Sequence, residues 1–200
     1  MSNDDFTKRK NIRNNIRKLR NGLSFNEQKI ASLNLYKRIL NYNIINNVKY
    51  VAIFFSFDGE INTFPLITQM LNKNINVYLP VIDPYHLRNL LFIKYNHTTQ
   101  LVLNKFNIFE PKIIYRDIID INQLDIIFVP LIAFNNLGYR LGMGGGFYDK
   151  ILQNCKDTIV PIGLAYDFQF ISFFPVYSWD ILLPIIFTPT KIWNNDYLIK

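Results

Sequence analysis

A glycine-rich stretch at residues 138–146 restricts the fold of this chain more than any other part of the sequence. Five of the eight glycines lie in it, so the conformational freedom of the backbone is concentrated in one loop. Upstream, residues 124–134 (LDIIFVPLIAF) form an apolar run that indicates a buried strand. Downstream, residues 147–152 look like the start of a helix. A strand, a glycine loop and a helix in this order suit phosphate, because glycines let successive N–H groups turn toward one anion.

Charged residues near both ends of the loop favour this interpretation. Arg140 can supply a full positive charge, and Asp149 can hold Mg²⁺ beside phosphates. The stretch is not a P-loop, because no Lys-Ser or Lys-Thr pair follows the last glycine. It is not a dinucleotide-binding fingerprint either, because Phe147 stands where that motif needs its third glycine. A mobile surface loop without a ligand stays open as the alternative.

Residues 140–149 (RLGMGGGFYD), with residues 129–134 before them, resemble the RLGxGxGYYD signature of the 5-formyltetrahydrofolate cyclo-ligase family. Three further stretches agree with that family in order and spacing: the basic N-terminal segment, residues 56–63 (SFDGEINT) and residues 163–169 (GLAYDFQ). The resemblance runs over nearly the whole chain. It implies an enzyme that uses ATP and Mg²⁺ to cyclise 5-formyltetrahydrofolate to 5,10-methenyltetrahydrofolate, with release of ADP and phosphate.

Length and composition suit one domain over residues 1–200. Half of the residues are hydrophobic, which is enough for a core, and no apolar run approaches the ~20 residues of a membrane span. The polar N-terminus does not read as a signal peptide. The single cysteine, Cys155, excludes an internal disulfide framework. A cytoplasmic enzyme fits all of these features. Together with the resemblance, they lead us to expect a monomer that acts on the small molecules 5-formyltetrahydrofolate and ATP, without a membrane or nucleic-acid partner.

Strand and helix patterns alternate along the chain, which predicts an α/β domain with a largely parallel sheet flanked by helices. The helices expected are residues 4–22, a second helix from the N-cap Ser24 to about residue 41, and residues 64–71. The strands expected besides 124–134 are residues 49–55, 75–81, 90–95, 158–165, 185–188 and 191–193. Apart from the strand at 90–95, residues 84–116 have no readable pattern.

Most of the net charge of +7 lies at the N-terminus, because residues 1–20 carry seven basic and two acidic side chains. A nucleic-acid-binding protein usually spreads its basic residues over a face, so this distribution fits a local anion better. In a helix over residues 4–22, four apolar residues make one stripe: Ile12, Ile16, Leu19 and Leu23. Four arginines lie on an adjoining face: Arg9, Arg13, Arg17 and Arg20. The residues alone leave open whether this basic face meets solvent or a cleft.

The family resemblance favours the cleft, because the first helix of that family binds nucleotide phosphates through a K-x-x-x-R pattern. Arg9 and Arg13 fall on those positions, and Arg9 departs from the usual Lys, which keeps the charge but changes the geometry. The ATP-binding residues implied by the resemblance are Arg9, Lys10, Arg13, Arg140, Leu141, Gly142, Met143, Gly144, Gly145, Gly146, Phe147 and Tyr148.

Glu60 follows Gly59 at an expected strand-to-helix turn, and ligands bind at that edge of open α/β sheets. A lone carboxylate there is commonly just a residue of the first helical turn. The resemblance implies that Glu60 contacts the folate and that Phe55 lines the same pocket. A carboxylate can accept from pterin N–H groups, and an aromatic ring can cover the pterin face. The resemblance also places five loop residues beside the substrate: Met143, Gly144, Gly145, Gly146 and Phe147.

The resemblance implies that Asp149 and Asp180 are the protein ligands of Mg²⁺. The family carries an E-x-H-D motif around the second of these residues, but here Tyr177 replaces the Glu and Trp179 replaces the His. Pro184 also stands where the family commonly has another Asp. These departures put the support of the metal site in doubt. Asp180 as an ordinary loop residue stays open.

In the reaction implied by the resemblance, ATP phosphorylates the formyl oxygen and makes it a good leaving group, after which N10 of the folate attacks the activated carbon. The task of the protein is then positioning and charge neutralisation, without a covalent nucleophile. One rival interpretation is a non-catalytic module that grips nucleotide or RNA phosphate. Another is an enzyme that transfers phosphate to a different small amide or a sugar.

Overall fold

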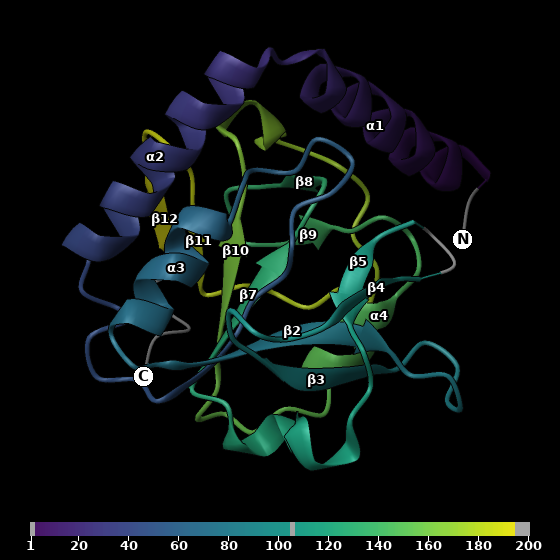
Figure 1. The fold of residues 1–200 in the computed structure, drawn as a ribbon. Helices are drawn as coiled ribbons and strands as arrows, with labels where there is room; N and C mark the ends of the chain where they lie inside the picture. The colour runs from purple at the N-terminus through teal and green to yellow at the C-terminus, as the bar shows by residue number, and fades with distance from the viewer. Residues whose placement is uncertain (1–2, 105–106, 195–200) are drawn as a thin grey trace.

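An eight-stranded sheet runs through the middle of the computed structural model, which describes residues 3–104 and 107–194 (Figure 1). In spatial order its strands are β12 (Ile192–Asn194), β11 (Ile185–Phe187), β10 (Val160–Leu164), β7 (Ile126–Pro130), β1 (Tyr50–Ala52), β2 (Asn76–Ile82), β3 (Leu90–Tyr95) and β6 (Ile118–Ile119). Neighbouring strands from β11 to β2 run parallel. Strands β12, β3 and β6 pair antiparallel at the two edges. The predicted α/β class with a largely parallel sheet is confirmed.

Helices cover both faces of this sheet (Figure 1). Along β1, Val51 packs into a core cluster with α2 (Phe25–Asn41) and α3 (Phe64–Asn72), while its neighbour Ala52 packs into a second cluster on the opposite face. Helix α4 (Phe147–Leu152) belongs to this second cluster. The alternation follows from the two-residue period of a strand. Both faces of the central strands are therefore buried, as parallel sheets require.

We predicted one strand over the apolar run at residues 124–134, and that prediction is wrong. Strand β7 ends at Pro130, and β8 (Ala133–Phe134) pairs with β9 (Arg140–Leu141) in a separate two-stranded sheet. The glycine-rich stretch is accordingly two turns. Gly138 closes the β8–β9 hairpin at φ +85, where a Cβ would lie 2.5 Å from the carbonyl oxygen of Leu183. The remaining four glycines of the stretch connect β9 to α4.

The poorly readable region, residues 84–116, contains β3 and two further short strands, β4 (Leu101–Leu103) and β5 (Phe109–Pro111). These two form a small antiparallel sheet of their own. Three short 3₁₀ helices complete the fold: η1 (Tyr115–Asp117), η2 (Ile121–Gln123) and η3 (Asp167–Gln169). Strands of three residues are too short to show a hydrophobic period, which is why the sequence did not reveal β4 and β5.

Helix α1 (Asn3–Gly22) lies apart from the two main clusters and rests on the β8–β9 hairpin (Figure 1). Ile16 anchors it in a third cluster with Leu141 and Phe174. The predicted apolar stripe is wrong at Leu19, which is 54% exposed, whereas Arg20 is 0% exposed. The inward face of α1 is thus partly cationic. In the described part of the chain, no helix has the length and apolar character needed to span a bilayer.

Candidate functional site

The site lies at the carboxyl edge of three neighbouring parallel strands, β1, β7 and β10. The segments that follow these strands are residues 53–63, residues 131–146 and residues 165–169. They contain residues 56–63 and most of the stretches at residues 140–149 and 163–169 that carried the resemblance. Helix α1 crosses this edge, and its arginines contact the first two segments and the loop before β11. Ligands bind at this edge of open parallel sheets, so the topology brings most of the predicted residues to one end of the molecule.

Arg13 lies directly against the glycine turn between β9 and α4. Its Nε donates to the carbonyl oxygen of Gly142 at 2.8 Å. Gly144 has φ +102, and a Cβ there would lie 3.8 Å from the Arg13 guanidinium. Burial and repulsion from Arg9 lower the pKa of Arg13. Because Met143 and the glycine after it are exposed, the turn presents a partly buried cation beside accessible backbone.

Arg140 is buried beneath the same turn and holds the first turn of α4. Its Nη2 donates to Oδ1 of Asp149 at 2.9 Å, and a Cβ on Gly142 would lie 3.3 Å from its Nη1. Burial lowers the pKa of Arg140, although Asp149 opposes this effect. The Asp149 side chain is 19% exposed, so its carboxylate is oriented by Arg140 but still meets solvent.

Arg9 forms an ion pair with Asp180. Arg9 was predicted to bind phosphate and Asp180 to bind metal. Arg9 donates Nη1 to Oδ2 of Asp180 at 2.6 Å and Nη2 to Oδ1 at 2.9 Å. The backbone N–H of Tyr177 donates to the same Oδ2 at 2.8 Å, and its ring lies 4.5 Å from the Arg9 guanidinium. The side chains of the pair are 7% and 2% exposed. Lys10, in contrast, is exposed.

The carboxylates of the site suit Mg²⁺ unequally. Within residues 3–104 and 107–194, no three His, Cys, Asp or Glu side chains gather in a way that could hold a metal. Mg²⁺ needs only one or two carboxylates when phosphate and water complete its shell. Asp149, partly exposed beside the glycine turn, fits that requirement. Asp180 does so only if its pair with Arg9 opens, so its role as a metal ligand stays a prediction.

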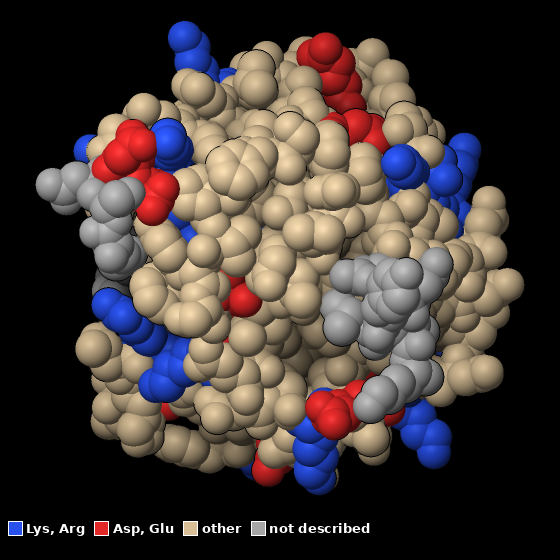
Figure 2. Space-filling model, turned by 180° about the vertical axis from the view of Figure 1, so that it is seen from behind, with Lys and Arg blue, Asp and Glu red and all other residues tan. Residues whose placement is uncertain are grey.

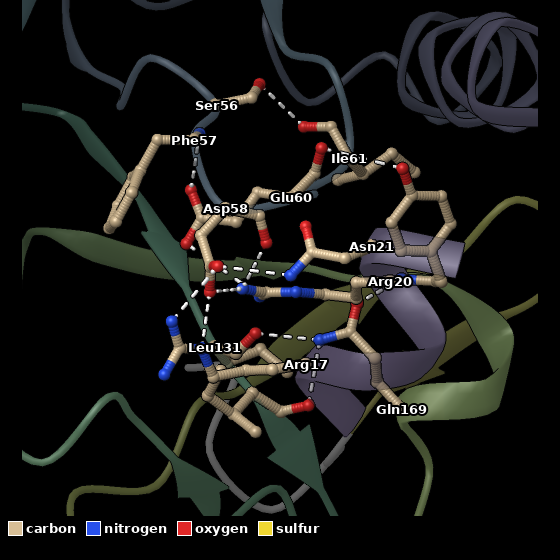
Figure 3. Close-up of polar contacts among 12 residues, drawn as sticks. Arg17, Arg20, Asn21, Ser56, Phe57, Asp58, Glu60, Ile61, Leu131 and Gln169 are labelled. Atoms are coloured by element: carbon tan, nitrogen blue, oxygen red, sulfur yellow. Dashed lines mark hydrogen bonds and ion pairs between the residues drawn. The ribbon is translucent and has the colours of Figure 1, made fainter. Parts of the chain in front are cut away.

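Glu60 occupies a buried turn after β1, and the close-up shows the side chains around it (Figure 3). It is 7% exposed. The N–H of Phe57 donates to its Oε2 at 3.3 Å, and Nη1 of Arg20 lies 3.9 Å from its Oε1. Burial raises the pKa of Glu60 to about 8, although the Arg20 charge opposes this effect. A carboxyl group with such a pKa can change its charge when a ligand arrives.

Two tyrosines lie near the Glu60 turn. The hydroxyl of Tyr166, after β10, donates to the backbone carbonyl of Glu60 at 3.5 Å. Burial raises the pKa of Tyr148 in α4, and the nearby Glu60 charge raises it further. Phe55 is half-buried and meets Tyr95 edge-on at 5.2 Å between ring centroids. The predicted phosphate and folate residues therefore adjoin each other, although their roles stay predictions.

Our sequence analysis did not assign a role in the site to three residues that support it in the structure. Arg20 was expected in the basic row but not beside Glu60, and Asp58 was not singled out at all. Gln169 is buried, and its Nε2 donates to the carbonyl oxygens of Leu131 at 2.7 Å and Ile132 at 2.9 Å (Figure 3). It therefore ties η3 to the chain that leaves β7. Asp58 and Gln169 both lie in stretches that carried the resemblance, which was the available signal.

Comparisons with known proteins match this chain over the whole site. The family described as the 5-formyltetrahydrofolate cyclo-ligase family matches residues 5–189. A 5-formyltetrahydrofolate cyclo-ligase of Escherichia coli (strain K12) is 42% identical over 180 residues, covering 90% of this chain and 99% of that protein. One of Haemophilus influenzae is 44% identical over 177 residues, covering 88% and 95%. The NMR structure of Aquifex aeolicus 5,10-methenyltetrahydrofolate synthetase superposes with a TM-score of 0.82 at 26% identity, covering 94% and 93%.

Proposed function

This chain belongs to the 5-formyltetrahydrofolate cyclo-ligase family, as its sequence motifs indicated, and we propose that it cyclises 5-formyltetrahydrofolate to 5,10-methenyltetrahydrofolate with Mg-ATP as co-substrate. ADP and phosphate would be released. The observation that carries the proposal is that one helix, α1, contacts both turns at one sheet edge: Arg20 donates to Asp58 beside Glu60, and Arg13 donates to Gly142 in the glycine turn. We also propose a monomeric, cytoplasmic enzyme, as the sequence predicted.

The chemistry requires that a formamide oxygen become a leaving group. Transfer of the γ-phosphoryl group to that oxygen achieves this, and N10 of the folate can then attack the carbon. Arg13 and the N–H groups of the glycine turn would hold the phosphates, and Arg140 would keep Asp149 in place. When bound at Asp149, Mg²⁺ would neutralise phosphate charge.

Glu60 and Phe55 would orient the pterin in this proposal. The oxygen Oε1 of Glu60 accepts no hydrogen bond that the structure shows, so it can accept from a pterin N–H group. Because burial raises the pKa of Glu60 to about 8, its carboxyl group is mostly protonated in the free protein at neutral pH. A charge-assisted contact with the pterin N–H groups in the complex therefore requires that folate binding release a proton from Glu60.

The proposal is tested by incubating the protein with Mg-ATP and 5-formyltetrahydrofolate and following methenyltetrahydrofolate absorbance. We expect product and ADP to form in equal amounts, because one phosphoryl transfer serves one cyclisation. Omission of ATP or chelation of Mg²⁺ should abolish the signal. Product formation without ATP, or ATP consumption without product, would contradict the proposed reaction.

A non-catalytic module that binds a polyanion is a less favoured function for this chain, because most arginines of α1 pair with carboxylates of the same chain. Arg9, Arg17 and Arg20 are paired with carboxylates of this chain. On the face opposite that of Figure 1, the Lys and Arg side chains form small separate groups with Asp and Glu among them (Figure 2). RNA binding that weakens steeply with salt, together with no turnover, would favour the module instead.

Arg13→Ala should raise the Michaelis constant for ATP roughly tenfold and change that for the folate little. The reason is its position against the glycine turn, where it would lose one charged hydrogen bond to phosphate, worth ~1.5–3 kcal/mol. We place the effect at the lower end of that range because Arg13 is only half-buried. Steady-state kinetics with each substrate varied in turn measure it, with exposed Lys18→Ala on the same helix as the control. Equal behaviour of the two variants would mean that Arg13 only braces the loop.

A further inference from the structure

Arg20 is a fully buried cation that the proposed chemistry does not use. It lies in the last turn of α1, is 0% exposed, and reaches between Asp58 and Glu60 (Figure 3). A buried charge is costly unless it is paired and hydrogen-bonded. A polar contact that serves only to attach α1 could be made at the surface at less cost. The depth of Arg20 therefore points to a role inside the site.

Asp58 fixes one end of the Arg20 guanidinium. Nη2 donates to the backbone carbonyl of Asp58 at 2.8 Å and to its Oδ2 at 3.0 Å. Asp58 also accepts from Arg17 at 2.6 Å and from Asn21 at 3.2 Å. The turn closes tightly on the helix, because a Cβ on Gly59 would lie 2.9 Å from the backbone carbon of Arg20. The guanidinium therefore has little freedom to move.

The other end of the guanidinium faces Glu60 without bonding to it. Nε and Nη1 of Arg20 have no hydrogen-bond partner within the part of the chain that the structure describes. Nη1 lies 3.9 Å from Oε1 of Glu60, which allows electrostatic attraction but is too long for a hydrogen bond. Arg20 thus attracts the carboxylate while its oxygen stays free to accept a hydrogen bond from a ligand.

Four charged or titratable groups influence Glu60 or contact it. They are Arg20 from α1, Asp58 from the same turn, Tyr148 from α4 and Tyr166 after β10. Arg20 is the cation of this group. We propose that Arg20 is a positioning residue which, fixed by Asp58, keeps the Glu60 carboxylate in place with its Oε1 available to the substrate. This inference rests on the proposed function, in which Glu60 binds the folate.

The test uses Arg20→Met, which keeps the length of the side chain and removes its charge, and Arg20→Lys, which keeps the charge. Calorimetric titration with 5-formyltetrahydrofolate between pH 6 and 9 measures binding, and titration with ATP serves as the control ligand. We expect Arg20→Met to weaken folate binding at least tenfold at pH 7 and to leave ATP binding within twofold. The loss should shrink as the pH rises, because the pKa of Glu60 climbs further without the cation. Arg20→Lys should recover most of the affinity.

Several results would overturn the inference. Unchanged folate affinity in Arg20→Met would do so, as would a loss that is equal at every pH and not rescued by Lys. If Arg20→Met does not fold, as judged by circular dichroism, Asp58→Asn replaces it, because it loosens Arg20 and leaves both Arg20 and Glu60 in the chain. A smaller folate-specific loss in Asp58→Asn supports the inference, and no loss contradicts it.

If the unaltered protein fails to bind 5-formyltetrahydrofolate, the proposed function falls first and this inference with it. If the unaltered protein binds and Glu60→Gln does not, a normal Arg20→Met refutes only the role of Arg20.

Discussion

Replacing Asp149 by Asn is expected to lower kcat about 100-fold or more while the protein stays folded. Asp149 is the carboxylate of the site that is both oriented, by Arg140, and partly exposed beside the glycine turn. Asn keeps the shape and an oxygen acceptor for Arg140 but removes the negative charge that would hold Mg²⁺. Removal of one preorganised charge-stabilising group costs about 10²–10³ in kcat in other enzymes. The variant should also need more Mg²⁺ for half-maximal rate.

The matched control is Asp157→Asn, an exposed carboxylate shortly after α4, which should leave both the rate and the metal dependence unchanged. Thermal unfolding separates catalysis from folding. Asp149→Asn weakens a partly buried ion pair, so we expect a loss of ~1–3 kcal/mol in the free energy of unfolding, too small to unfold the chain. Near-normal turnover of Asp149→Asn at low Mg²⁺ would show that the metal is held elsewhere.

Glu60→Gln should weaken folate binding about 100-fold and leave ATP binding nearly unchanged. The substitution replaces one acceptor oxygen with an NH₂ donor that opposes the pterin N–H group. A lost charge-assisted bond (~1.5–3 kcal/mol) and an unpaired ligand donor (~1–3 kcal/mol) both contribute. ATP is spared because its phosphates belong to Arg13 and the glycine turn. Separate calorimetric titrations with the two ligands measure the effect, and Glu27→Gln is the control because Gln also serves at that capping position.

Glu60→Gln should also change how the free energy of unfolding depends on pH in the absence of ligand. Burial raises the pKa of Glu60 from 4.5 to about 8 in the folded protein. Between about pH 4.5 and 8 the unfolded chain has released a proton that the folded chain keeps. The free energy of unfolding therefore falls as pH rises through that window, by up to ~1.4 kcal/mol per pH unit from this group. Glu60→Gln should remove this slope.

Equal loss of both ligands, or of neither, would mean that the folate pocket is not at Glu60.

The fold could be predicted because its signals are local. Alternating strand and helix patterns, the capping box at Ser24 and the glycine turn before α4 each depend on residues a few positions apart. The break at Pro130 was also visible in principle, because proline has no N–H to donate and disfavours an unbroken central strand. The length and β-branched character of the run outweighed that signal.

The inward face of α1 could not be predicted in the same way. Hydrophobic spacing places Leu19 inside, but Arg20 takes the buried position because Asp58 and Glu60 lie there to receive it. The pairing of Arg9 with Asp180 joins two residues that were assigned to different ligands. Which partner a charged side chain finds depends on the folded arrangement, and no local pattern records it.

The docking of α1 has a consequence for the order in which the molecule assembles. Arg9 meets Asp180 across 171 positions and Arg13 meets Gly142 across 129. Contacts between such distant segments carry a loop-closure cost that must be met before the contacts form, so they tend to form late in folding. The two main core clusters contain no residue of α1, so the sheet and its covering helices can persist while this helix is detached. Local opening at the N-terminus would then remove Arg9, Arg13 and Arg20 from the site together. We therefore expect the site to be lost at a lower free-energy cost than the fold itself, because detaching α1 does not require the sheet to unfold.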